Sequence, residues 1–172
     1  MENSQTNLFC EPSIALAHPS APSCSEGIYY GKLKFTYQNN KRFRKIKISS
    51  SRDIFSFLKS IWPFDIEVRE RFYVLFLDRS NCVIGYEELS SGGVTGTIVD
   101  PKLIFQKALL TPGMTSVVLS HNHPSGNLNP SREDIAITEK IKSGCILLDI
   151  VLMDHFIITK NSYYGFADAG AL

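Results

Sequence analysis

The sequence lacks three features that would each point to a particular class of protein. Its four cysteines are widely spaced and form no C-x-x-C pair, so neither a disulfide framework nor a thiolate zinc site is expected. No apolar run approaches the roughly 20 residues that cross a bilayer, and no basic start precedes an unbroken apolar segment. The formal net charge of +1 gives no overall attraction to nucleic acid or membrane. We therefore expect a cytoplasmic protein with reduced thiols and no membrane partner.

The composition is that of a folded globular chain. Hydrophobic residues make up 44% and charged residues 20%, which argues against disorder over the whole length. A length of 172 residues suits one domain with a substantial core. Residues 1–26 are rich in Ser, Pro, Asn and Ala without a sustained period, so we expect a loose N-terminal arm there and one domain over 27–172.

Positive charge is concentrated at the start of this domain. Residues 27–52 contain eight Lys or Arg residues and no Asp or Glu. Two β-like runs around the polar turn at 38–40 predict a basic β-hairpin over 28–49. The segment 32–52 is a candidate for weak contact with DNA phosphates. Lysines that discourage pairing between edge strands explain the same charge, and we favour that explanation.

The rest of the pattern alternates strands with helices, which favours an α/β fold with a mixed β-sheet flanked by helices. The expected elements are a helix capped by Ser50 or Ser51 and ended by Pro63, strands at 72–77 and 82–86, a helix from Asp100–Pro101 to near Pro112–Gly113, a strand at 117–119, a helix from Pro130–Ser131 to about Lys142, and strands near 147–153 and 155–160.

The most informative stretch follows the expected strand at 117–119. His121 and His123 are two residues apart, so strand geometry points both side chains to the same side. Ser131 and Asp134 share one face at the start of the next helix. Imidazole nitrogen and carboxylate oxygen suit zinc, and a catalytic site keeps one position open for a water whose pKa falls to about 7. The sequence therefore predicts one zinc ion per chain, held by His121, His123 and Asp134.

These residues resemble the RadC-like branch of the JAMM (JAB1/MPN+) metalloproteins. The pattern of that family is an upstream Glu, then H-x-H, seven residues, Ser, two residues and Asp. This chain reads H-N-H-P-S-G at 121–126 and P-S-x-x-D at 130–134, and the similarity extends over a motif region at 70–166. The resemblance implies a JAMM/JAB-like fold and zinc-dependent hydrolysis of an amide bond in a peptide or isopeptide.

The resemblance also implies roles for two further residues. The catalytic Glu of the family stands just before the first central strand, which corresponds to Glu70 here, with Glu67, Glu87 and Glu88 as competitors. Glu70 would take a proton from the attacking water. Ser131 would donate a hydrogen bond to the oxyanion of a tetrahedral intermediate, although Ser131 and Asp134 can also act simply as a helix cap.

Two further sets of residues have more than one interpretation. Asp154 and His155 are either a pair that orients a ligand or a turn Asp beside a structural His, and we leave them outside the site. Ser125 and Asn122 flank the ligands and are secondary candidates for substrate binding. Loop chemistry alone also explains Ser125.

Two alternative functions remain open. One is a DNA-repair or DNA-associated accessory protein with structural or vestigial zinc, although we find no helix-hairpin-helix segment in residues 1–60, which many RadC-like proteins carry. The other is a metal-dependent nuclease, which is disfavoured because phosphodiester hydrolases usually assemble two metals. A structural zinc normally has four protein ligands, so an open set of three favours an enzyme.

Overall fold

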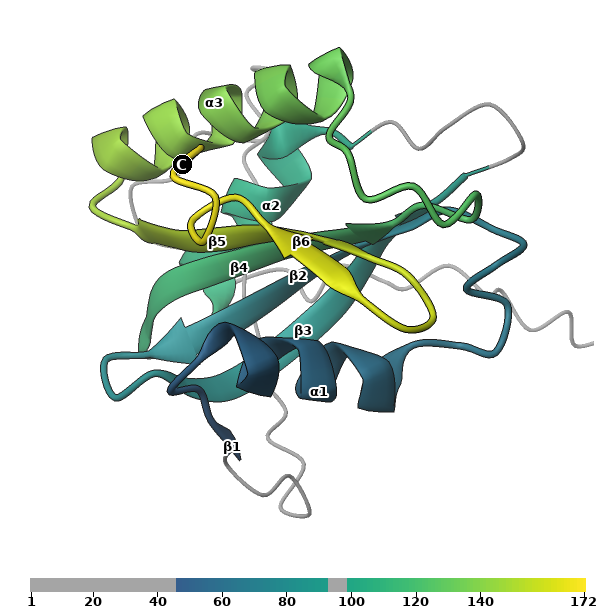
Figure 1. Ribbon diagram of the computed structural model, residues 1–172. Coiled ribbons are helices and arrows are strands. Elements are labelled where there is room, and N and C mark those ends of the chain that lie inside the picture. Colours follow the sequence, from purple (N-terminus) through teal and green to yellow (C-terminus); the bar gives the residue numbers. More distant parts are fainter. Residues whose placement is uncertain (1–45, 93–98) are drawn as a thin grey trace, which may run out of the picture. The chain divides into compact units, whose positions relative to one another are not determined.

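The computed structural model describes residues 46–92 and 99–172, and these form one curled six-stranded sheet with three helices (Figure 1). The chain divides by its contacts into units 1–36 and 37–172, and every described residue belongs to the second unit. The expected arm at 1–26 and most of the expected hairpin at 28–49 lie outside the described residues.

The sheet is mixed, as the sequence predicts. Its strand order is β1-β3-β2-β4-β5-β6, in which β4 and β5 are parallel and all other neighbours are antiparallel. The strands are β1 (Ile46–Lys47), β2 (Arg71–Asp78), β3 (Cys82–Ser91), β4 (Met114–Asn122), β5 (Val151–Ile158) and β6 (Tyr163–Gly165).

Helices cover both faces of this sheet (Figure 1). One face carries α1 (Ser51–Ile61), and the other carries α2 (Pro101–Leu110) and α3 (Arg132–Leu147). Ser50 caps α1 by accepting a hydrogen bond from the backbone N–H of Asp53, and Asp100 caps α2, with Pro101 in its first turn. Within residues 46–92 and 99–172, no helix has the length and apolar character needed to span a membrane.

The two faces of β2 belong to two different hydrophobic clusters. Tyr73 and Leu75 pack in the cluster that includes α1, whereas Phe72 and Val74 pack in the cluster that includes α2 and α3. Successive side chains of a strand point to opposite faces, so a strand between two helical layers must be apolar throughout. The continuous apolar run in the sequence therefore marks a central strand.

The predicted pair of strands near 147–153 and 155–160 is wrong. The helix α3 continues through Leu147, and a single strand, β5, then runs from Val151 to Ile158. The chain turns between them at Asp149, whose φ of 54° lies in the left-handed region. A short β6 follows after residues 159–162. Asp154 and His155 lie in the middle of β5 and are buried, so they do not form a turn.

Candidate metal centre

The end of β4 and the start of α3 bring three potential ligands together. His121 lies near the end of β4, His123 follows the strand directly, and Asp134 lies in the first turn of α3. One ligand atom from each residue lies within 4.8 Å of the others. The structure thus places the predicted set of His121, His123 and Asp134 in one cluster that can hold a metal ion.

The distances between these ligand atoms are short. The Nε2 atoms of His121 and His123 are 3.0 Å apart. The Asp134 carboxylate lies 3.1 Å from Nε2 of His121 through Oδ1 and 3.5 Å from Nε2 of His123 through Oδ2. Burial opposes ionisation of Asp134, but the adjacent imidazole rings of His121 and His123 hold the pKa of its carboxyl well below the usual range. The hydrogen bond to Asp134 likewise raises the pKa of His123.

This donor set fits zinc. Zinc bonds of about 2.0–2.1 Å in tetrahedral geometry place ligand atoms about 3.3 Å from one another, close to the observed separations. Two imidazoles and one carboxylate are donors that zinc takes in catalytic sites, where a fourth position stays open. The residues present therefore meet the requirements of an open zinc site.

The loop and the helix cap orient two of these side chains. Nδ1 of His123 donates to the backbone carbonyl of Asn127 at 2.7 Å, which directs Nε2 towards the cluster. Ser131 is the N-cap of α3 and accepts from the backbone N–H of Asp134. The Asp134 carboxylate accepts in return from the backbone N–H and hydroxyl of Ser131, at 2.7 and 2.6 Å. The capping role and the ligand role are thus compatible.

A further chain of contacts lies behind His121. Its Nδ1 is 2.9 Å from Nε2 of His155, and Nδ1 of His155 is 2.6 Å from the hydroxyl oxygen of Thr138. That hydroxyl donates to the backbone carbonyl of Asp134 at 2.6 Å. Sequence reasoning left His155 outside the site and did not select Thr138. The available signal was the spacing of Thr138, four residues after Asp134 and therefore on the same helix face.

Asp154 behaves differently from His155. Its carboxylate accepts hydrogen bonds from the backbone N–H groups of His155 and Ala167. Burial raises the pKa of Asp154 to about 6. Alternation along β5 points Asp154 and His155 to opposite faces of the sheet. Only His155 of this pair contacts a residue of the metal cluster.

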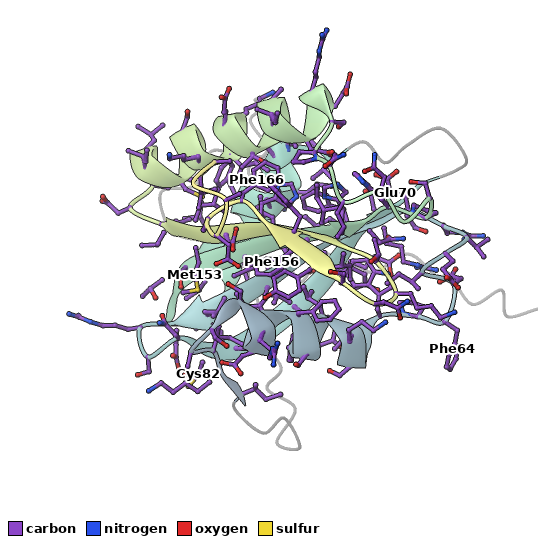
Figure 2. All side chains as sticks on the ribbon, in the orientation of Figure 1. Phe64, Glu70, Cys82, Met153, Phe156 and Phe166 are labelled. Carbon is purple, nitrogen blue, oxygen red and sulfur yellow. The ribbon has the colours of Figure 1, made fainter. Side chains whose placement is uncertain are left out.

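Glu70 lies beside the cluster because of the pairing between β2 and β4. In that antiparallel pair Phe72 is opposite His121, and two further steps of the same register bring Glu70 opposite His123. Glu70, His123 and Ser131 line one cavity of about 520 Å³, together with Val68, Pro124, Ser125, Asn127, Asn129 and Pro130. Figure 2 shows Glu70 close to the loop that leads into α3.

The three competing glutamates have other partners, and none of them lines this cavity. Glu67 pairs with Lys160 at 2.9 Å, and Glu87 pairs with Lys107 at 2.6 Å. Glu88 bonds to both Arg71 and the Tyr73 hydroxyl, at 2.7 and 2.6 Å. The position of Glu70 is the one that suits a base acting on a molecule held in the cavity.

Asn122 and Ser125, the secondary candidates for substrate binding, separate in the structure. Ser125 lines the cavity. Asn122 is fully buried and bonds to the segment before β2. Its amide nitrogen donates to the carbonyls of Ile66 and Arg69, and its amide oxygen accepts from the backbone N–H of Arg71. Through these hydrogen bonds, Asn122 holds in place the segment before β2 that contains Glu70.

Comparison with known proteins places this arrangement in a family. The family model described as "RadC-like JAB domain" matches residues 48–171, which is most of the chain. The chain belongs to this family. The resemblance found in the sequence is therefore confirmed, and the RadC-like JAB region includes Glu70, the His-His-Asp cluster, Ser131 and the Thr138–His155 pair.

Several relatives carry the name UPF0758 protein. The one from Flavobacterium johnsoniae is 50% identical over 125 residues, which cover 72% of this chain and 53% of that protein. The one from Fusobacterium nucleatum is 37% identical over 147 residues, or 84% of this chain and 60% of that protein. The one from Chlorobaculum tepidum is 35% identical over 131 residues, or 76% and 58%. The matched part of this chain thus spans between half and three fifths of each relative.

Proposed function

We propose that this RadC-like JAB domain is a zinc-dependent hydrolase that cleaves an amide bond in a peptide or isopeptide. The observation that carries the proposal is the convergence of the three ligand atoms, one of them on His123, which lines the same cavity as Glu70 and Ser131. Zinc, when bound, supplies a Lewis acid and lowers the pKa of a bound water to about 7.

The chain's own groups then have distinct tasks. The Glu70 carboxylate accepts the proton of the attacking water and delivers a proton to the leaving nitrogen, the usual work of a positioned acid–base group. The Ser131 hydroxyl donates to Asp134 in the structure. Rotation of that hydroxyl hydrogen towards the cavity lets Ser131 donate to the oxyanion that develops as the amide carbon becomes tetrahedral.

The cavity favours an uncharged bond over a phosphodiester. None of the described residues that line it is Lys or Arg, the side chains that most often hold a phosphate group. Phosphodiester hydrolases usually assemble two metal ions, and the His121–His123–Asp134 cluster has donors for one. Both observations support amide hydrolysis over the nuclease alternative.

Metal analysis combined with turnover of a peptide library tests this proposal. We expect about one zinc per chain in the wild type. Glu70→Gln should keep the zinc and lose roughly 10²–10⁴-fold in turnover. Glu67→Gln is the matched control, because Glu67 precedes the same strand but pairs with Lys160 on the surface, and it should keep full activity. Ser131→Ala should keep the metal and lose on the order of 10²–10³-fold.

Three results would count against the proposal. Stoichiometric zinc in His121→Ala or His123→Ala would show that the ion is held elsewhere. Wild-type turnover by Glu70→Gln would move the base to another residue. Bound zinc with no activity that responds to any of these carboxylates would favour the alternative of a DNA-associated accessory protein with structural zinc.

A further inference from the structure

The contacts behind His121 form a continuous path between two of the candidate ligands. The path begins at the backbone carbonyl of Asp134, passes through the Thr138 hydroxyl and the His155 ring, and ends at Nδ1 of His121. Thr138 and His155 are buried, so water does not compete for these polar atoms. Each hydrogen atom on the path must therefore be assigned to one of the groups within it.

The direction of the path is set at its first step. A carbonyl oxygen can only accept, so the single hydroxyl hydrogen of Thr138 is used on Asp134. The hydroxyl oxygen of Thr138 must then accept from Nδ1 of His155, which lies 2.6 Å away. The Thr138 hydroxyl thus fixes the ring proton of His155 on Nδ1.

The surroundings of His155 keep its ring neutral. The ring stacks on Phe166 at a centroid separation of 4.9 Å and lies against Phe72 at 5.6 Å. His155 is completely buried between these rings, and an apolar enclosure disfavours the charged form of an imidazole. A neutral imidazole has only one N–H, so Nε2 of His155 carries a lone pair. That lone pair accepts the proton on Nδ1 of His121.

We infer that Thr138 and His155 are positioning residues that hold the proton of His121 on Nδ1, leaving the Nε2 lone pair free for a metal ion. This inference rests on the proposed zinc site. The reverse order of donors would place a proton on Nε2 of His121, where it would donate to the Asp134 carboxylate 3.1 Å away and occupy the lone pair that a metal ion needs. The path therefore sets the affinity of the cluster for zinc without touching the ion.

Two substitutions of Thr138 in the full chain test this role. Thr138→Val keeps the branched shape and removes the hydroxyl, whereas Thr138→Ser keeps the hydroxyl. Zinc affinity is measured by competition with a chelator. Thr138→Val should bind zinc 10–100-fold more weakly, the usual effect of losing a group that orients a ligand, and Thr138→Ser should remain close to wild type. Ile141→Val is the matched control, since Ile141 is buried on the same helix but has no polar side-chain atom that could take part in the path, and its zinc affinity should not change.

A second readout follows the protons themselves. The ¹⁵N shifts of the imidazole nitrogens in zinc-free protein should show His155 protonated on Nδ1 and bare on Nε2, with a proton on Nδ1 of His121. In Thr138→Val the proton of His155 should move to Nε2. A purely structural role for Thr138 would change stability and leave this signature in place.

The outcomes separate the inference from the proposed function. A wild-type His155 protonated on Nε2, or wild-type zinc affinity in Thr138→Val, would overturn the inference even if the protein is a zinc hydrolase. A wild type that does not bind zinc would overturn the proposed function. In that case the proton positions of His155 still decide whether Thr138 directs the path.

Discussion

Asn122 stands between the two histidines of the cluster in sequence, yet its side chain serves a different part of the molecule. It donates to two backbone carbonyls and accepts from one backbone N–H in the segment 66–71. An Asn side chain offers both donors and an acceptor, and Asp, with acceptors only when ionised, cannot replace it here. The H-N-H sequence thus contains two candidate ligands, His121 and His123, and between them the residue that holds the Glu70 segment in place.

Asn122→Ala should therefore destabilise the protein without removing a ligand. The change leaves the buried carbonyl of Ile66 and the part-buried backbone groups of Arg69 and Arg71 without their partner, which costs about 2–4 kcal/mol in the free energy of unfolding. Urea unfolding measures the loss, and hydrogen exchange at the Arg71 amide should become faster. Asn129→Ala, at an exposed position, is the control. A loss no larger than that of the control would show that the segment holds its position by other means.

Asp154 gives a prediction about pH. Burial raises the pKa of its carboxyl from 3.8 to about 6, so the folded state disfavours the charged form. The associated destabilisation is absent below about pH 4, grows as the pH rises to 6, and is complete above that. At about 1.4 kcal/mol for each pKa unit, it amounts to roughly 3 kcal/mol.

Asp154→Asn should remove this dependence, because Asn keeps the oxygen that accepts from His155 and Ala167. The free energy of unfolding of the variant, compared with that of wild type, should rise by roughly 2–3 kcal/mol between pH 4 and pH 7. Denaturant titrations at several pH values measure the difference. Asp149→Asn is the control, since Asn also tolerates positive φ. A constant difference across this range would mean that Asp154 titrates at its ordinary value.

At the scale of elements, local chemistry predicted the helix starts well. Ser50, Asp100 and Ser131 each cap a helix in the structure, because a cap depends only on residues within one turn. The end of α3 was less accessible to prediction, since the apolar residues at 146–148 suggest either a strand or a helix end. Strand pairing with β4 decides where β5 begins, and that information is distant in the sequence.

Prediction of the site was limited in the same way, by contacts between residues that are distant in the sequence. The spacing of His121, His123 and Asp134 was sufficient to predict that they converge, because all three belong to one strand–helix connection. The role of His155 was not predictable in this way, because it depends on the parallel pairing of β5 with β4, where His155 lies opposite Leu119. Contacts that require long-range pairing were the ones left out.

Packing between α2 and α3 gives a prediction at this scale. Gly144 lies in α3, and a Cβ added there would stand 2.4 Å from the ring of Phe105 on α2. An Ala in a helix is ordinarily about 1 kcal/mol more favourable than Gly. The overlap reverses this preference, so Gly144→Ala should lower the free energy of unfolding by about 1–3 kcal/mol. In a Phe105→Leu background the same change should become neutral or stabilising. Stabilisation by Gly144→Ala alone would show that the Phe105 ring moves aside freely.

At the scale of the whole molecule, a bound zinc ion should link the end of β4 to the start of α3 and so stabilise the folded state. An ion that binds only the folded state stabilises it by about 2.7 kcal/mol at a free concentration one hundred times its Kd. Zinc should therefore raise the Tm of the zinc-free protein, and a chelator should reverse the rise. Asp134→Ala should greatly reduce the shift, whereas Glu133→Ala, which removes the neighbouring exposed acid of α3, should leave it unchanged. An equal shift in both variants would mean that zinc binds at another place.

The origin of the ligands also has a consequence for how the protein becomes active. All three candidate ligands lie within residues 121–134, whereas Glu70 lies 51 residues before His121 and reaches the cavity only through the pairing of β2 with β4. Contacts between distant residues carry a larger loop-closure cost and form later in folding. On the proposed function, a newly made chain can bind zinc before the pairing of β2 with β4 brings Glu70 beside the ligands. The order of assembly would then keep the immature protein from cutting nearby polypeptides, its own chain included.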